Sequence, residues 1–108
     1  MMDIPQLTQK MNAFVTSKGW YEADSPRPQT PRNLAISLSL EAAELLEHFQ
    51  WCDEAGDKAE LESELADVML YLLQLAHRSG IDLEQAVLHK LEINAGRSWD
   101  ADRCGEQA

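Results

Sequence analysis

The chain has few of the residues that several common classes of protein require. It has only two cysteines in 108 residues, and Cys52 and Cys104 fit neither a zinc site nor a Cys-x-x-Cys redox motif. Nine Lys and Arg stand against nineteen Asp and Glu, for a formal net charge of −10. Because nucleic-acid backbones are bound by clustered cations, this balance argues against DNA or RNA polymers as partners.

Long apolar runs are missing as well. The longest strongly apolar run, VMLYLLQLA, is too short to cross a bilayer. The first ten residues, MMDIPQLTQK, are too polar for a secretory signal peptide. We therefore expect a cytoplasmic protein with reduced thiols and no membrane partner.

What the sequence does contain is helical periodicity. Hydrophobic residues make up 44% of the chain, and aliphatic side chains outnumber aromatic ones. The spacing of these residues, with capping residues and prolines at the starts, predicts helices at about 4–18, 31–52, 58–79 and 83–95. We expect one domain over residues 1–108, with a frayed tail from about residue 98.

Short turns between the helices predict an all-α fold, an antiparallel four-helix bundle. The second and third helices are apolar over more than one stripe, and a chain this small cannot cover that surface. We therefore expect oligomerisation to complete the bundle, as a homodimer or a homotetramer.

Four acidic residues form two matched pairs on the second and third helices. Glu41 and Glu44 lie three apart in SLEAAELLEHFQW, and Glu64 and Asp67 lie three apart in ELADVMLYLL. Three residues of helix turn through about 300°, so each pair shares a face, where like charges repel. The alternative is a solvated acidic face, but these pairs are surrounded by Leu, Val, Met and Ala rather than Lys. Oxygen ligands favour a hard ion, Mg²⁺ or alternatively Mn²⁺, over zinc or copper.

Aromatic and imidazole side chains lie near this predicted acidic groove. His48 and Trp51 continue the acidic arc of the second helix, and Tyr71 continues that of the third. Trp20 lies in the loop GWYEADSPRPQ, where a large ring either packs on the core or meets a flat ligand. His48 is interpreted either as a surface or supporting group or as a substrate contact.

The fourth helix, if it continues a turn beyond residue 95, places two cations and an amide on one face, namely Lys90, Arg97 and Asn94. Acids, cations and aromatic rings together suit a metal-bound nucleoside triphosphate. The sequence has no Gly-x-x-x-x-Gly-Lys motif, so phosphate binding would depend on metal and side chains. A di-iron carboxylate bundle would need His three residues after Glu, and none of the three histidines has that spacing.

These segments, EAAELLEHFQW, ELADVMLYLL and DLEQAVLHKLEIN, resemble the MazG-like, all-α nucleoside triphosphate pyrophosphohydrolases. PRNLAISLSLEAAELLEHFQW, with Lys90 and Asn94 downstream, most resembles the short single-domain branch that contains dCTP pyrophosphatases and integron-associated MazG proteins. The similarity covers roughly residues 5–97.

The resemblance implies Mg²⁺-dependent cleavage of a (d)NTP between its α and β phosphates, giving a (d)NMP and pyrophosphate. The expected substrates are dCTP or related pyrimidine deoxynucleotides, and the expected role is removal of surplus or non-standard nucleotides. It also implies a tight dimer or tetramer with sites shared between subunits. The matching positions are Glu41, Glu44, Glu64 and Asp67 for metal and catalysis, Lys90, Asn94 and Arg97 for phosphate, and Trp20, Trp51 and Tyr71 for base or sugar.

Two departures from the family pattern bear on these expectations. Gln29 stands where the animal dCTP enzymes have a histidine, which leaves base selection open. Ser98 and Trp99 follow Arg97 where the family commonly has Tyr-Pro. The alternative function is a catalytically silent nucleotide- or metal-binding helical module, although such a descendant would be expected to lose at least one of the four acids.

Overall fold

The computed structural model describes residues 1–97, which are helical with connecting turns and contain no strand. The predicted fraying of the tail and the Ser98-Trp99 departure lie outside these residues. The all-α prediction is confirmed, and no helix within residues 1–97 is long and apolar enough to span a membrane. The helices are α1 (Ile4–Ser17), α2 (Pro31–Glu47), α3 (Lys58–Arg78) and α4 (Leu83–Ala95).

The helix starts follow from their capping residues, as the sequence predicts. Asp3 accepts a hydrogen bond from the Gln6 backbone N–H, and the Gln6 side chain accepts one from the Asp3 N–H. Asp57 accepts from two backbone N–H groups in the first turn of α3, which are otherwise without helical partners. Gly80 ends α3 with a φ of 69°, a left-handed conformation that glycine adopts without strain.

The end of α2 differs from the prediction. The helix ends at Glu47 rather than near Cys52. The next backbone bonds run from His48 to Leu45 and from Phe49 to Leu46, so the spacing tightens from four residues to three and the helix does not continue. Trp51 was expected to continue the acidic arc of α2, but it lies beyond the end of that helix.

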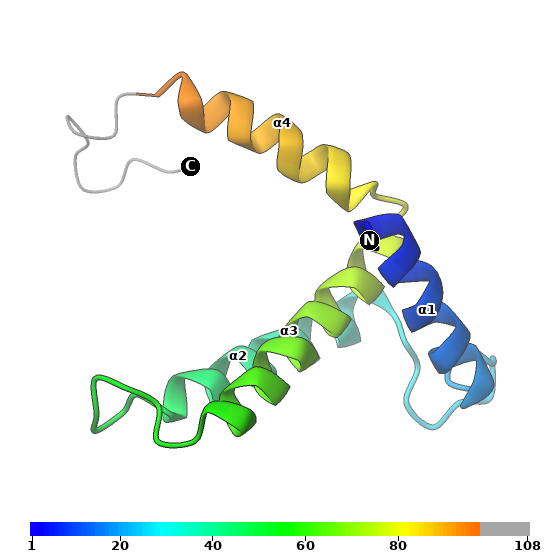
Figure 1. The fold of residues 1–108 in the computed structure, drawn as a ribbon. Coiled ribbons are helices and arrows are strands. Elements are labelled where there is room, and N and C mark those ends of the chain that lie inside the picture. The colour runs from blue at the N-terminus through cyan, green and yellow to red at the C-terminus, as the bar shows by residue number, and fades with distance from the viewer. Residues whose placement is uncertain (98–108) are drawn as a thin grey trace.

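The packing of the helices is open rather than closed. Helices α2 and α3 run antiparallel side by side, and α1 packs near the carboxyl end of α3 (Figure 1). Met11 and Val15 of α1 form a small core with Leu73 of α3. Leu83, at the start of α4, packs on this cluster, and the rest of α4 leads away from the α2–α3 pair (Figure 1).

One chain consequently leaves much apolar surface exposed. The radius of gyration is 16.7 Å, whereas a compact domain of this length is expected at about 13 Å. Leu40 and Leu46 on α2 and Leu91 on α4 are each more than half exposed. Leu65 on α3 is also half exposed. The chain alone thus forms four helices without closing a bundle around them.

Candidate functional site

The four predicted acids interact across the α2–α3 pair. Burial raises the pKa of the Glu41 carboxyl, and a hydrogen bond with Glu44 and the negative charge of Glu44 raise it further. The charges of Asp67 and Glu64, on the facing helix, act in the same direction. Glu41 Oε2 is buried without a hydrogen-bond partner among the described residues. The two pairs therefore form one acidic cluster, as the helical spacing predicts.

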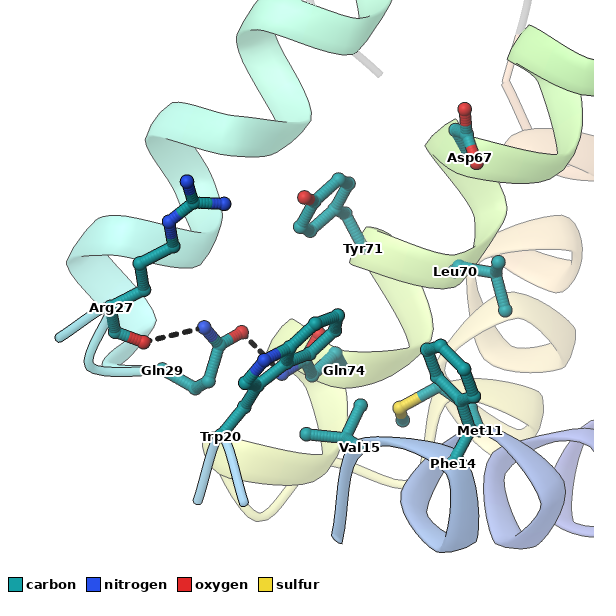
Figure 2. A pocket seen from close by; sticks show the side chains of 10 residues that line it. All are labelled: Met11, Phe14, Val15, Trp20, Arg27, Gln29, Asp67, Leu70, Tyr71 and Gln74. Carbon is teal, nitrogen blue, oxygen red and sulfur yellow. Dashed lines mark hydrogen bonds between the residues drawn. The ribbon is translucent and has the colours of Figure 1, made fainter. Parts of the chain in front are cut away.

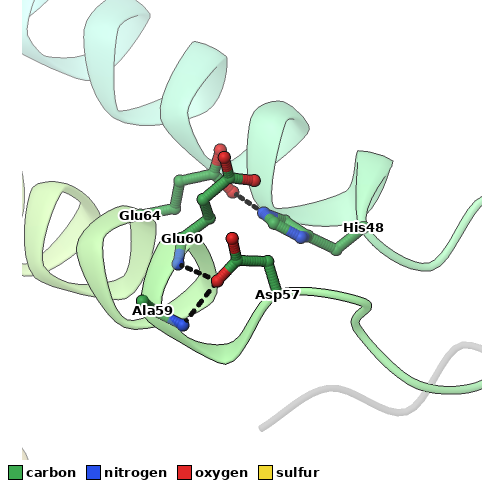
Figure 3. A network of polar contacts seen from close by, with 5 residues as sticks. All are labelled: His48, Asp57, Ala59, Glu60 and Glu64. Atoms are coloured by element: carbon green, nitrogen blue, oxygen red, sulfur yellow. Dashed lines mark hydrogen bonds and ion pairs between the residues drawn. The ribbon is translucent and has the colours of Figure 1, made fainter.

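His48 belongs to this cluster through Glu64. Its Nε2 atom lies 2.5 Å from Glu64 Oε2, which joins the residue capping the end of α2 to an acid of α3 (Figure 3). Asp57, also shown in Figure 3, caps the start of α3 with its carboxylate, so its Oδ1 atom is already engaged in two hydrogen bonds. The structure thus places His48 beside the acids, in contact with Glu64.

The chemistry of the cluster fits a hard divalent cation. All of its candidate ligands are carboxylate oxygens, which suit Mg²⁺ or Mn²⁺. Within residues 1–97, no three His, Cys, Asp or Glu side chains are already close enough to hold one ion together. The raised pKa of the Glu41 carboxyl and its buried Oε2 atom, which has no hydrogen-bond partner among the described residues, nevertheless fit a site that a cation would stabilise.

An aromatic-walled pocket of about 230 Å³ lies beside Asp67 (Figure 2). The rings of Phe14 and Trp20 meet edge to face, with centroids 5.6 Å apart, and make one wall. Tyr71, one helical turn from Asp67, lines the pocket from α3. The full lining is Met11, Phe14, Val15, Trp20, Arg27, Gln29, Asp67, Leu70, Tyr71 and Gln74.

The structure gathers some of the remaining predicted site residues and separates others. Trp20 and Tyr71 line the pocket beside the acids, as their assignment to the base or sugar requires. Trp51 is 87% exposed and lies in the turn after α2. The face of α4 that was expected to meet phosphate belongs to the helix that leads away from the α2–α3 pair (Figure 1). That face carries Lys90 and Asn94, whereas Arg97 was expected on the same face but lies beyond the end of α4 at Ala95.

Sequence reasoning missed several residues of the pocket. Phe14 was not singled out as a site residue, but it forms a pocket wall with Trp20. Gln74 was not singled out as a site residue, although an amide inside the apolar run YLLQLA was a usable signal. A polar side chain on a buried helix face needs hydrogen-bond partners, and so marks either a structural network or a binding site.

Comparison with known proteins agrees with the geometry. The model of the MazG-like family matches residues 36–104. The sequence is 41% identical over 85 residues to dCTP pyrophosphatase 1 of Bos taurus, covering 70% of this chain and 50% of that protein. It is 44% identical over 45 residues to a dATP/dGTP diphosphohydrolase of Cyanophage S-2L, covering 42% of this chain and 43% of that protein. The chain thus spans about half the length of the curated relatives it matches.

A solved structure extends the agreement to the fold. The chain superposes on the crystal structure of a pyrophosphatase from Archaeoglobus fulgidus with a TM-score of 0.72 and 37% sequence identity. The match covers 87% of this chain and 90% of that one. The family model, the relatives and this neighbour agree, and we conclude that the chain belongs to the MazG-like family.

Proposed function

We propose that the protein is a Mg²⁺-dependent nucleoside triphosphate pyrophosphohydrolase that acts on dCTP or a related pyrimidine deoxynucleotide. One water is consumed, and the products are the nucleoside monophosphate and pyrophosphate. The observation that carries the proposal is the acidic cluster of α2 and α3 opening beside an aromatic-walled pocket at Asp67. The names of the relatives, dCTP pyrophosphatase 1 and dATP/dGTP diphosphohydrolase, support the same reaction class.

The acids would serve as the metal site. Glu41, Glu44, Glu64 and Asp67 would hold Mg²⁺, with Mn²⁺ as an alternative ion. When bound, the ion neutralises charge on the triphosphate and polarises its phosphoryl oxygens. His48 would keep Glu64 oriented through its Nε2 contact. Glu41, whose pKa is raised, would release any proton it holds when a cation enters the cluster.

The pocket would hold the nucleoside end of the substrate. Trp20 and Phe14 offer an apolar wall, and Tyr71 lies between the pocket and the acids. Because stacking on a ring accepts any base, these aromatic groups would bind without selecting strongly. Trp51 is the remaining aromatic candidate for the base or sugar, and its exposure in a single chain leaves its whole ring free to meet a ligand or a partner.

The phosphate-binding residues would come from a second copy of the chain. Lys90 and Asn94 lie on α4, which leads away from the acids of its own chain, and Arg97 follows the end of this helix at Ala95 (Figure 1). Exposed leucines on α2 and α4 provide the apolar surface that such an association would bury. We therefore propose a homodimer or homotetramer with shared sites, working in the cytoplasm to clear surplus or non-standard nucleotides.

The test is hydrolysis of dCTP with and without Mg²⁺, with dCMP and pyrophosphate separated by ion-exchange chromatography. We expect turnover with Mg²⁺ and none with EDTA, because the carboxylates alone would repel the triphosphate. Binding of dCTP without the appearance of dCMP would instead identify the silent binding module.

A further inference from the structure

The pocket contains one buried amide whose orientation is set by its neighbours. Gln74 of α3 is only 4% exposed, yet it lines the pocket with Trp20 and Tyr71. Burying an amide among apolar side chains is unfavourable unless its donors and acceptor are used. The question is therefore which of its atoms are committed within the protein and which remain for a ligand.

A chain of hydrogen bonds from the backbone determines how the Gln74 amide lies. Gln29 Nε2 donates to the Arg27 carbonyl oxygen at 2.7 Å, so Gln29 must turn its Oε1 atom the other way. Gln74 Nε2 donates to that Oε1 atom at 2.6 Å (Figure 2). Arg78 Nε also donates to the Gln29 carbonyl oxygen at 3.1 Å, which holds this loop residue against α3. A carbonyl only accepts, so neither amide can be reversed without losing a bond.

The Tyr21 phenol is a further neighbour of the Gln74 amide. Burial raises the pKa of the Tyr21 phenol, while the Arg78 guanidinium and a side-chain hydrogen bond with Gln74 lower it in part. Tyr21 in turn donates to Asn12 Oδ1 at 2.8 Å. Because the Gln74 nitrogen donates to Gln29, the Gln74 oxygen is the acceptor that remains for a ligand.

We propose that Gln74 selects the base, by offering Oε1 as a hydrogen-bond acceptor to an exocyclic amino group, and that Gln29 is the residue that positions it. This inference rests on the proposed function and specifies its substrate class. Cytosine and adenine carry amino donors, whereas uracil, thymine and guanine carry a carbonyl oxygen at the corresponding position. A carbonyl facing Oε1 leaves two acceptors opposed in a buried site, so a site built this way rejects it.

The sharpest comparison uses ligands that differ at this position alone. Cytosine and uracil deoxynucleotides have the same size and sugar, and differ by an amino group against a carbonyl at C4 and by the proton on N3. Binding of dCMP and dUMP is measured by calorimetry without metal, and turnover of dCTP and dUTP is measured with Mg²⁺. The variants are Gln74→Leu, which removes the acceptor, and Gln29→Leu, which frees the Gln74 amide to rotate. Gln9→Leu, on an exposed face of α1, is the matched control.

We expect the wild type and Gln9→Leu to bind dCMP at least about tenfold more tightly than dUMP. Gln74→Leu should reduce that ratio to less than about threefold, chiefly by losing dCMP affinity. Gln29→Leu should also bring the ratio toward one while keeping binding of both ligands, because a rotating amide offers either atom. A purely structural role for Gln74 would lower both affinities together and leave their ratio unchanged.

The two readouts separate this inference from the proposed function. A wild type that prefers dCMP, with the preference lost in Gln74→Leu, supports base selection by Gln74 even if neither triphosphate is hydrolysed. Equal affinity for the two monophosphates, or binding of neither, overturns it even if dCTP is hydrolysed. An unchanged ratio in Gln74→Leu, or in Gln29→Leu where Gln74→Leu does not fold, also overturns it.

Discussion

His48 Nε2 lies 2.5 Å from Glu64 Oε2, so the imidazole at the end of α2 is in direct contact with the acidic cluster (Figure 3). The contact leaves Glu64 Oε1 for another partner, and it limits the rotation of the carboxylate. Groups that orient metal ligands in this way commonly affect metal affinity nearly as much as the ligands themselves. We therefore expect His48 to act on the site through the acids rather than from the base pocket.

Replacing His48 tests this role. We expect His48→Ala to raise the Mg²⁺ concentration for half-maximal activity by about tenfold or more, because Glu64 loses its orienting partner. His48→Gln keeps a nitrogen donor and should show a smaller shift. The measurement is a Mg²⁺ titration of dCTP hydrolysis for the three proteins. If half-saturation by Mg²⁺ does not move while the KM for dCTP rises, His48 contacts substrate instead.

Glu41→Gln should abolish turnover while preserving the fold. We expect kcat/KM to fall by at least about a hundredfold, since the most strongly perturbed carboxylate of the cluster is lost. Helical content measured by circular dichroism should be unchanged. Glu62→Gln, on an exposed part of α3, is the matched control and should keep wild-type activity. Turnover near the wild-type rate in Glu41→Gln would remove the metal assignment.

The same variant should be more stable than the wild type when metal is absent. Folding raises the pKa of Glu41 above its ordinary value of 4.5, through burial first and then through Glu44, Asp67 and Glu64. Because this pKa is raised on folding, the contribution of Glu41 to the free energy of unfolding is fully present below pH 4.5, the ordinary pKa. It is lost as the pH rises through the pKa of the folded state. Glutamine does not ionise, so Glu41→Gln does not lose stability in this way. In EDTA, the Tm of Glu41→Gln should therefore exceed that of the wild type above pH 4.5. Excess Mg²⁺ should reverse the order, and a wild type more stable than Glu41→Gln in EDTA at pH 7 would contradict the account.

The acidic cluster could be predicted from the sequence because it depends on local geometry. A spacing of three puts Glu41 beside Glu44 and Glu64 beside Asp67 on any helix, and a short turn makes the two helices antiparallel neighbours. Trp51 could not be placed in this way, because its position depends on where α2 ends. That end is set by the shift to three-residue hydrogen bonds after Glu47, which helical periodicity does not reveal.

The pocket was harder to predict because it joins segments that are distant in the sequence. The hydrogen bond between Gln29 and Gln74 spans 45 positions, and the Phe14–Trp20 wall comes from α1 and the following loop. Neither partner of the amide pair carries a local signal of the other. The direction of α4 likewise depends on the few contacts at its start, of which Leu83 is one.

A shared site predicts that two inactive variants will restore activity to each other. Glu41→Gln damages the acids and Lys90→Ala damages the phosphate side, so a mixed dimer would keep one intact site if these residues meet across subunits. Random mixing after co-expression should recover about a quarter of wild-type activity, in a species that light scattering shows to be at least a dimer. A mixture no more active than its separate components, or a monomer at micromolar concentration, would show that each chain forms its own site.

Trp51 and Trp20 provide the last test, because they differ in exposure within one chain. Trp51 is 87% exposed, so Trp51→Ala removes little packing and should leave the Tm of the isolated chain almost unchanged. Trp20 packs edge to face on Phe14, so Trp20→Ala should lower both Tm and activity.

If Trp51 stacks on the base, its loss should reduce kcat/KM for dCTP by about tenfold, in line with ~1–3 kcal/mol per stacked base. The assay compares kcat/KM for the common nucleotides in both variants and the wild type. A uniform loss below about threefold in Trp51→Ala would exclude this residue from the substrate site.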